Sequence, residues 1–195
     1  MVFLSDRDGV FEVRPSSIKN AGNGVFCLRR VKAGTILPYY GITIRDDDED
    51  GGDVYGDSYR TYVISADYTT RFGNQRTAKG LSVDGDPGLP QLRRLDAFKR
   101  LASQINEASG DSLPNCLLAT NPAVSRADIY RSLDDGVPFP VTYVVVIEDL
   151  MKGTELLTCY GDDYGERGYT PCKMRRRAYG EIIGRAYNYI EALPK

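Results

Sequence analysis

Some segments of the chain alternate apolar and polar residues, with the two-residue period of half-buried β-strands, and others are short apolar runs. In the first half, alternation predicts strands over residues 10–14 and 59–66, an apolar run predicts one over 24–28, and β-branched and aromatic residues predict one over 35–44. A shorter strand is expected over 81–84. In the second half, the run PVTYVVVI predicts the strongest strand, over 140–147, and TELLTCY predicts another over 154–160. Residues 69–80 and 106–121 are expected to be irregular, because they are polar or are interrupted by glycine and proline.

Only two segments show the spacing of an amphipathic helix. Apolar residues recur every three or four positions over 91–105, and again over 173–192, where no proline intervenes. The first apolar stripe is most simply part of the core. Many short strands and two helices predict a mainly β fold, without the alternating strand–helix pattern of a doubly wound nucleotide-binding protein. A length of 195 residues fits one domain with a short appendage.

Charge and hydropathy exclude several classes of partner. The 25 Lys and Arg residues against 27 Asp and Glu give a net charge of −2, whereas general nucleic-acid binders are usually strongly basic. No apolar run approaches the roughly 20 residues of a membrane span. Charged residues close to the N-terminus argue against a secretory signal. We therefore expect an intracellular protein that binds neither nucleic acid nor membrane directly.

The absence of histidine limits the chemistry that the chain can perform. It excludes a Ser-His-Asp or Cys-His triad and any histidine metal ligand, so proton handling would fall to Tyr, Lys, Cys or a carboxylate. The four cysteines lie far apart without a CxxC pair, which favours free thiols in a reducing compartment. A four-thiolate zinc site is the alternative, although the short ligand spacing typical of such sites is missing.

Three short motifs could form a binding site, and each also has an ordinary structural explanation. The sequence AGNG, residues 21–24, brings backbone close to a ligand or simply makes a tight turn before a strand. INEASGDSLPNC contains Asn106 and Glu107 and reads equally as a loop that caps a helix. YGDDY, which begins at Tyr160, could be an ordinary strand end.

In their order and spacing, these motifs resemble those of the SET-domain protein-lysine methyltransferases. IKNAGNGVFCLRRVKAGTIL and YYG are similar to the opening of that family, INEASGDSLPNC to its Asn-His…Pro-Asn motif, and IEDLMKGTELLTCYGDDYG to its closing segment. The compact size and the YGDDY ending also resemble small viral SET enzymes. The departures are Pro38 for an acidic residue, Glu107 for the histidine, Thr154 for the first of two glutamates, and the missing zinc-binding cysteine cluster.

The resemblance implies a fold of small curled β-sheets with a knot-like crossing, in which residues 106–115 meet the segment of Tyr160. A SET domain would cover residues 1–165, with inserts near 46–53 and 69–104. Residues 166–195 would form a helical lid segment, whose amphipathic helix closes the substrate channel in place of the cysteine cluster.

The resemblance also implies a cofactor, S-adenosylmethionine, and an acceptor, the lysine amine of another protein. The catalytic residue would be Tyr160. Cofactor binding would fall to Ala21, Gly22, Asn23, Gly24, Asn106, Glu107 and Tyr160. The lysine channel would be lined by Tyr39, Thr158, Tyr164 and Tyr169. No metal is expected, because methyl transfer from a sulfonium to a neutral amine is an in-line displacement that needs neither metal nor histidine.

Two further expectations concern the product and the substrate. Thr158 stands where the family often has Phe or Tyr, and its small size predicts di- or trimethylation, unless Tyr62 or Tyr143 fills the space. The acidic run DDDEDGGD, residues 46–53, would suit a basic substrate such as a histone tail. That run is otherwise a solvated surface loop whose charges are screened by salt.

Two other functions stay open. A SET-like module without catalysis could serve as a protein-binding platform, and a small β domain could bind no ligand at all. S-adenosylhomocysteine would stabilise the platform without any methyl transfer, and it would leave the second kind of protein unchanged.

Overall fold

The computed structural model of the chain describes residues 9–45, 63–70, 72–109, 113–160, 172 and 180–191. Several predicted features lie outside these residues: the acidic loop over 46–53, the aromatic residues Tyr62, Tyr164 and Tyr169, and the domain boundary at residue 165.

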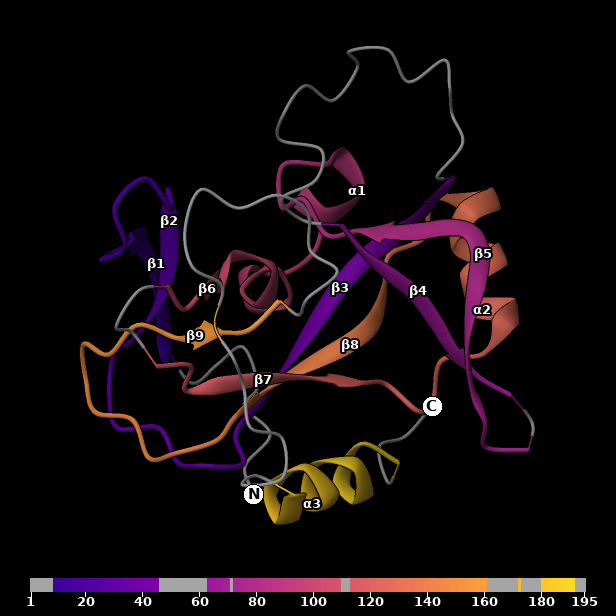
Figure 1. Ribbon diagram of the computed structural model, residues 1–195. Coiled ribbons are helices and arrows are strands. Elements are labelled where there is room, and N and C mark those ends of the chain that lie inside the picture. Colours follow the sequence, from indigo (N-terminus) through magenta and orange to yellow (C-terminus); the bar gives the residue numbers. More distant parts are fainter. Residues whose placement is uncertain are drawn as a thin grey trace.

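The largest sheet has five antiparallel strands in the order β4-β5-β3-β8-β7 (Figure 1). Its strands are β3 (Ile36–Arg45), β4 (Val63–Thr69), β5 (Gln75–Asp84), β7 (Cys116–Thr120) and β8 (Phe139–Val146). Two smaller sheets pair β1 (Phe11–Pro15) with β2 (Asn23–Cys27), antiparallel, and β6 (Asn106–Glu107) with β9 (Leu157–Thr158), parallel. The predicted fold class is thus confirmed as mainly β with several small sheets, while the knot-like crossing stays a prediction.

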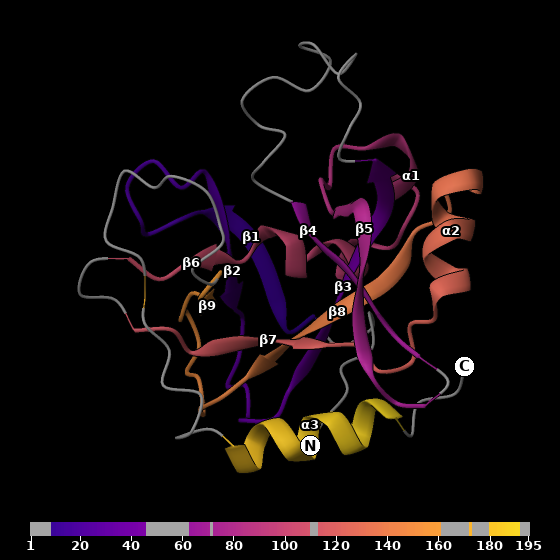
Figure 2. The same ribbon diagram turned by 45° about the vertical axis from the view of Figure 1, so that its right-hand side comes forward.

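The helices of the described residues are short. They are α1 (Pro90–Arg93), α2 (Arg126–Asp135) and α3 (Gly180–Glu191), with two 3₁₀ turns, η3 (Ala97–Arg100) and η4 (Ala102–Gln104). α2 packs against β3 and β4 at one side of the large sheet, and α3 lies beside β7 (Figure 2). α3 falls within the range 173–192 predicted for a helix, and its role as a lid stays a prediction. Within the described ranges, no helix is both long and apolar enough to cross a membrane.

The prediction of one amphipathic helix over 91–105 is wrong. The chain forms α1, η3 and η4 there, and it is interrupted at Asp96, whose backbone is extended (φ −54°, ψ 148°). Leu92, Leu101 and Ile105 are nevertheless buried, so the apolar stripe does belong to the core. Single turns of 3₁₀ and α-helix space their apolar residues almost alike, and periodicity therefore does not distinguish them from a continuous helix.

The two segments expected to be irregular contain β-strands, and a helix follows the second of them. β5 begins at Gln75 and pairs with β4, and β7 begins at Cys116. α2, which the sequence analysis does not predict, begins with a capping box: Ser125 Oγ accepts from the Asp128 amide, and the Asp128 carboxylate accepts from the Ser125 amide. Gly136 ends the helix in the left-handed conformation, at φ 64°. Both signals stand in the sequence, but α2 is too short and too polar to show a clear apolar stripe.

The cysteines divide into two kinds. Cys27 and Cys116 are buried free thiols, as predicted. Cys159 and Cys172 are joined as a disulfide, with their Cα atoms 5.7 Å apart, so the prediction of free thiols is wrong for this pair. Their spacing along the sequence does not reveal that the chain brings Cys172 back to the end of β9.

Candidate functional site

The parallel pair β6–β9 brings together two of the three sequence motifs. Its register places Asn106 opposite Leu157 and Glu107 opposite Thr158. Asn115 fastens the same junction, because its amide nitrogen donates to the Glu155 carbonyl (2.8 Å) and its amide oxygen accepts from the Leu157 amide (2.9 Å). Asn106, Glu107 and Asn115 therefore do meet the segment that leads to Tyr160.

Tyr160 is held at both ends. Its hydroxyl donates to the Ile105 carbonyl (2.8 Å), and its backbone amide donates to Glu107 Oε1 (3.1 Å). Glu107 is only 4% exposed, so its carboxylate lies inside the junction. The Glu107 side chain thus contacts the candidate catalytic tyrosine, in addition to the backbone role that the resemblance implies.

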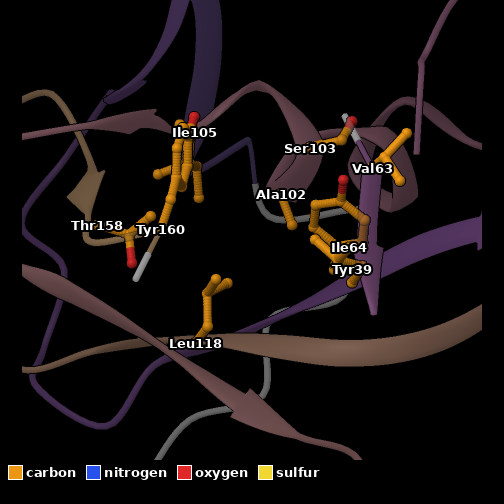
Figure 3. Close-up of a pocket in the computed structure, with 9 residues that line it drawn as sticks. All are labelled: Tyr39, Val63, Ile64, Ala102, Ser103, Ile105, Leu118, Thr158 and Tyr160. Carbon is orange, nitrogen blue, oxygen red and sulfur yellow. The ribbon is translucent and has the colours of Figure 1, made fainter. Parts of the chain in front are cut away.

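Tyr160 forms one wall of a small cavity between η4, the large sheet and β9. Figure 3 shows Tyr160 and Thr158 on one side and Tyr39 on the other, with Leu118 beneath. The cavity is lined by Tyr39, Val63, Ile64, Ala102, Ser103, Ile105, Leu118, Thr158 and Tyr160. Apart from the two phenols and two small hydroxyls, these side chains are apolar. The predicted channel residues Tyr39 and Thr158 therefore do come together with Tyr160.

The size of the cavity limits what it can hold. The cavity has a volume of about 40 Å³, measured as the space open to the centre of a water-sized sphere. A single water needs roughly 10–15 Å³ on that measure, so there is space for about three. That volume suits the end of a lysine side chain and is far too small for a nucleoside.

Local structure explains why Tyr39 and Thr158 face this space. β3 has a register shift between Tyr39 and Tyr40 where it pairs with β8, and such a bulge re-aims the side chains next to it. Thr158 is buried, and its hydroxyl donates to the Cys116 carbonyl (3.3 Å). Thr158 therefore lines the cavity with a small side chain, and Tyr143 is not among the described residues that line it.

The Gly22–Gly24 loop lies beside Asn106, as the resemblance implies. The Asn106 amide nitrogen donates to the Asn23 carbonyl (2.9 Å) and to Glu155 Oε1 (3.2 Å). No hydrogen bond of the Asn106 amide oxygen is found among the described residues. Ala21 closes the turn before this loop by donating from its amide to the Ile18 carbonyl (3.2 Å).

The two glycines of this loop are needed for different reasons. Gly22 has a positive φ of 69° and open space around it, so it supplies a backbone conformation that other residues rarely adopt. Gly24 has no such constraint, but a Cβ added there would overlap Glu155 Oε1. The sequence leaves open whether these glycines bring backbone close to a ligand or make a tight turn; in the structure, Gly24 also makes room for the side chain of Glu155.

Glu155 is the site residue that the sequence analysis misses. It is 6% exposed, and its carboxylate accepts from Ser16 Oγ (2.6 Å), the Ser17 amide (2.9 Å), Ser17 Oγ and Asn106. Burial raises the pKa of this carboxyl, but the hydrogen bonds from Ser16, Ser17 and Asn106 outweigh that effect and hold its pKa below the ordinary value. The available signal was its position five residues before Tyr160, directly after Thr154 in the motif GTELLTCYG.

Among the described residues, no group of three or more His, Cys, Asp or Glu side chains could hold a metal ion. The polar groups of the site are the Tyr160 hydroxyl, the Ile105 carbonyl, two buried carboxylates and the Asn106 amide. Their oxygens can accept hydrogen bonds, and such a set can orient a ligand and stabilise positive charge.

No protein-family model matches the chain, and no curated protein matches it either. Among solved structures, it is similar to the Neurospora SET domain protein DIM-5, a histone lysine methyltransferase, with 19% identity and a TM-score of 0.47 over 84% of this chain. It is also similar to a candidate histone methyltransferase from Plasmodium falciparum, with 18% identity and a TM-score of 0.41 over 79% of this chain and 95% of the other.

The chain spans 56% of the length of the Neurospora protein. Because both TM-scores lie below 0.5, neither likeness decides the family or the activity of this chain. The expected similarity to small viral SET enzymes stays a prediction.

Proposed function

We propose that this chain is an S-adenosylmethionine-dependent protein-lysine N-methyltransferase. The observation that carries the proposal is the pairing of the Tyr160 hydroxyl with the Ile105 carbonyl at the wall of a small, mostly apolar cavity. The residue after Ile105 is Asn106, which contacts the Gly22–Gly24 loop. A site of the size of a lysine end thus adjoins a separate polar surface that can hold a larger ligand.

The polar surface fits the cofactor in chemistry. The cavity excludes a nucleoside, so the cofactor would lie against the main chain of Gly22, Asn23 and Gly24. The Asn106 amide oxygen would accept from the ammonium group of its methionine part. When bound, S-adenosylmethionine supplies a methyl group on a positively charged sulfur.

The residues of the cavity prepare the acceptor amine. Apolar walls remove water from a lysine ammonium group and lower its pKa, which favours the neutral amine that attacks the methyl carbon. The rings of Tyr39 and Tyr160 attract the positive charge that develops on the nitrogen. The oxygens of Tyr160 and of the Ile105 carbonyl accept weak hydrogen bonds from a polarised methyl group and help to orient it for in-line transfer.

The proposal extends to the substrate and the product. We take the acceptor to be a lysine of a basic protein, with a histone tail as the first choice, met inside the cell without direct contact with nucleic acid or membrane. Thr158 leaves space beside the amine for one or two methyl groups, which supports di- or trimethylation. Aromatic residues of the lid, Tyr164 and Tyr169, would complete the channel.

The test is a methylation assay with radiolabelled S-adenosylmethionine on mixed histones and on cell lysate, read by mass spectrometry. Transfer to lysine is expected from the wild type and, at a rate lower by about a hundredfold, from Tyr160→Phe. Thermal stabilisation by S-adenosylhomocysteine without transfer to any protein would instead identify a protein-binding platform. The absence of both transfer and stabilisation would contradict the proposed function.

A further inference from the structure

Glu155 joins three segments that are far apart in the sequence. Its backbone pairs with Phe26 as an isolated antiparallel bridge, and the next amide, of Leu156, donates to the Val25 carbonyl (2.8 Å). This pairing puts the Glu155 side chain directly beside Gly24. From there the carboxylate reaches the loop between β1 and β2 on one side and Asn106 of β6 on the other.

The hydrogen-bonding capacity of this carboxylate is filled by the chain itself. A carboxylate has about four lone-pair sites. Four donors converge on it: Ser16 Oγ, the Ser17 amide, Ser17 Oγ and the Asn106 amide nitrogen. Glu155 therefore has no site left for the ammonium group of a cofactor, and any effect on ligand binding must pass through the groups that it holds.

Glu107, the second buried carboxylate of the junction, is engaged elsewhere. Its Oε1 accepts from the Tyr160 amide and thus fixes the residue that would act on the acceptor amine. Glu155 sits on the segment that contains Tyr160 but holds the loop and Asn106, whereas Glu107 sits on β6 and holds Tyr160. The two carboxylates thus support different halves of the site.

We propose that Glu155 is a positioning residue that sets cofactor affinity, by holding the loop of residues 16–24 and Asn106 in one arrangement. This inference rests on the proposed function, because it names S-adenosylmethionine as the ligand of that loop. The inference assigns Glu155 to cofactor binding and Glu107 to turnover. If either residue had a purely structural role, its substitution would not change the Kd and kcat separately in this way.

The critical variant is Glu155→Gln. Gln keeps the shape of the side chain but replaces one acceptor oxygen by an NH₂ donor. Whichever way the amide is turned, that donor faces either the Ser17 amide or the Asn106 amide nitrogen, and one N–H group loses its partner. The expected result is a Kd for S-adenosylhomocysteine about tenfold higher by calorimetry, with kcat at saturating cofactor within about threefold of the wild type.

Glu107→Leu is the contrasting variant in the same junction: it removes the acceptor of the Tyr160 amide, and it should lower kcat while the Kd changes less than about twofold. Ser17→Ala is a milder variant that removes one donor, and it should raise the Kd about threefold even if Glu155→Gln folds poorly. Hydrogen exchange gives a readout without activity: amides of residues 16–24 should exchange faster in Glu155→Gln, while those of β3 and β8 stay protected.

The outcomes are distinct. If the wild type binds S-adenosylhomocysteine and both Glu155→Gln and Ser17→Ala bind it equally well, the proposed function stands and the role of Glu155 is overturned. If the wild type does not bind S-adenosylhomocysteine, the proposed function fails and the role of Glu155 in cofactor binding fails with it. An equal loss of kcat and affinity in both glutamate variants would also overturn the division between them.

Discussion

Gly24 and Glu155 share one space in the structure: Oε1 of Glu155 occupies the position where a side chain on Gly24 would begin. The glycine is therefore required at this position even before any ligand is considered. The same contact brings the GxG loop, Asn106 and the segment of Tyr160 within hydrogen-bonding reach of one carboxylate.

This relationship predicts a coupling between the two residues. Gly24→Ala should lower the free energy of unfolding by about 1–3 kcal/mol, because the new Cβ displaces a buried carboxylate. In a Glu155→Ala background, Gly24→Ala should lower the free energy of unfolding much less. A double-mutant cycle measured by urea unfolding should therefore give a coupling energy of about 1 kcal/mol or more.

Gly22→Ala is the control for that cycle. It should cost about 1–2 kcal/mol in both backgrounds, because its effect arises from the left-handed backbone and not from a contact with Glu155. Additive effects of Gly24→Ala and Glu155→Ala would show that the two residues do not compete for the same space.

A second prediction concerns Tyr160→Phe. Loss of the hydrogen bond to the Ile105 carbonyl should lower the free energy of unfolding by only about 1 kcal/mol, so the protein should fold. Turnover in the radiolabelled methyl assay should fall by about a hundredfold, the usual scale for one lost transition-state donor or acceptor. Tyr130→Phe removes the same atom from the surface of α2 and should leave turnover unchanged. Normal turnover in Tyr160→Phe would remove this residue from catalysis.

A third prediction concerns the number of methyl groups transferred. Thr158 lines the cavity and is buried, so Thr158→Phe would fill space beside the acceptor amine. We expect the wild type to reach di- or trimethyl-lysine and the variant to stop earlier, with the first transfer retained. Mass spectra recorded at excess cofactor measure the product distribution. A wild type that stops at monomethyl-lysine would contradict the argument from size.

The fourth prediction concerns acid stability and Asp149, which lies outside the candidate site. Lys32 Nζ (2.7 Å), the Ala33 amide (3.0 Å) and the Arg30 guanidinium (2.8 Å) donate to its carboxylate and hold its pKa well below the ordinary value of about 3.9. A pKa lowered by folding stabilises the folded state above the unfolded-state pKa, and that stabilisation is lost as the pH falls below about 4.

The matched variant is Asp149→Asn. Its melting temperature should be lower than that of the wild type near pH 7, and the gap should narrow as the pH falls from about 4 to 2. Because the group is exposed, the gap at pH 7 should also shrink in high salt. A gap that stays constant over this pH range would show that the carboxylate charge contributes nothing.

Much of the fold can be read from local patterns. The patterns over 10–14, 24–28, 35–44 and 140–147 correspond to β1, β2, β3 and β8 within one or two residues. β2, β3 and β8 are buried along most of their length and therefore carry runs of apolar residues, whereas the largely exposed β1 shows an alternation of apolar and polar residues. The helix over 91–105 was wrong because apolar spacing reports burial and not the continuity of backbone hydrogen bonds across Asp96.

For the candidate site too, part can be read from the sequence and part depends on the tertiary structure. The sequence by itself determined which residue types are available: no histidine, a GxG turn, Asn106, and a tyrosine after a short strand. Only the tertiary structure decided that Tyr160 meets the Ile105 carbonyl and that Glu155 fills the space beside Gly24. β6 and β9 have only two residues each, so they are too short to leave a periodic pattern in the sequence. They pair in parallel although they lie far apart along the chain. Such contacts depend on where the large sheet and the β1–β2 hairpin place their ends, and no local preference of the sequence encodes that placement.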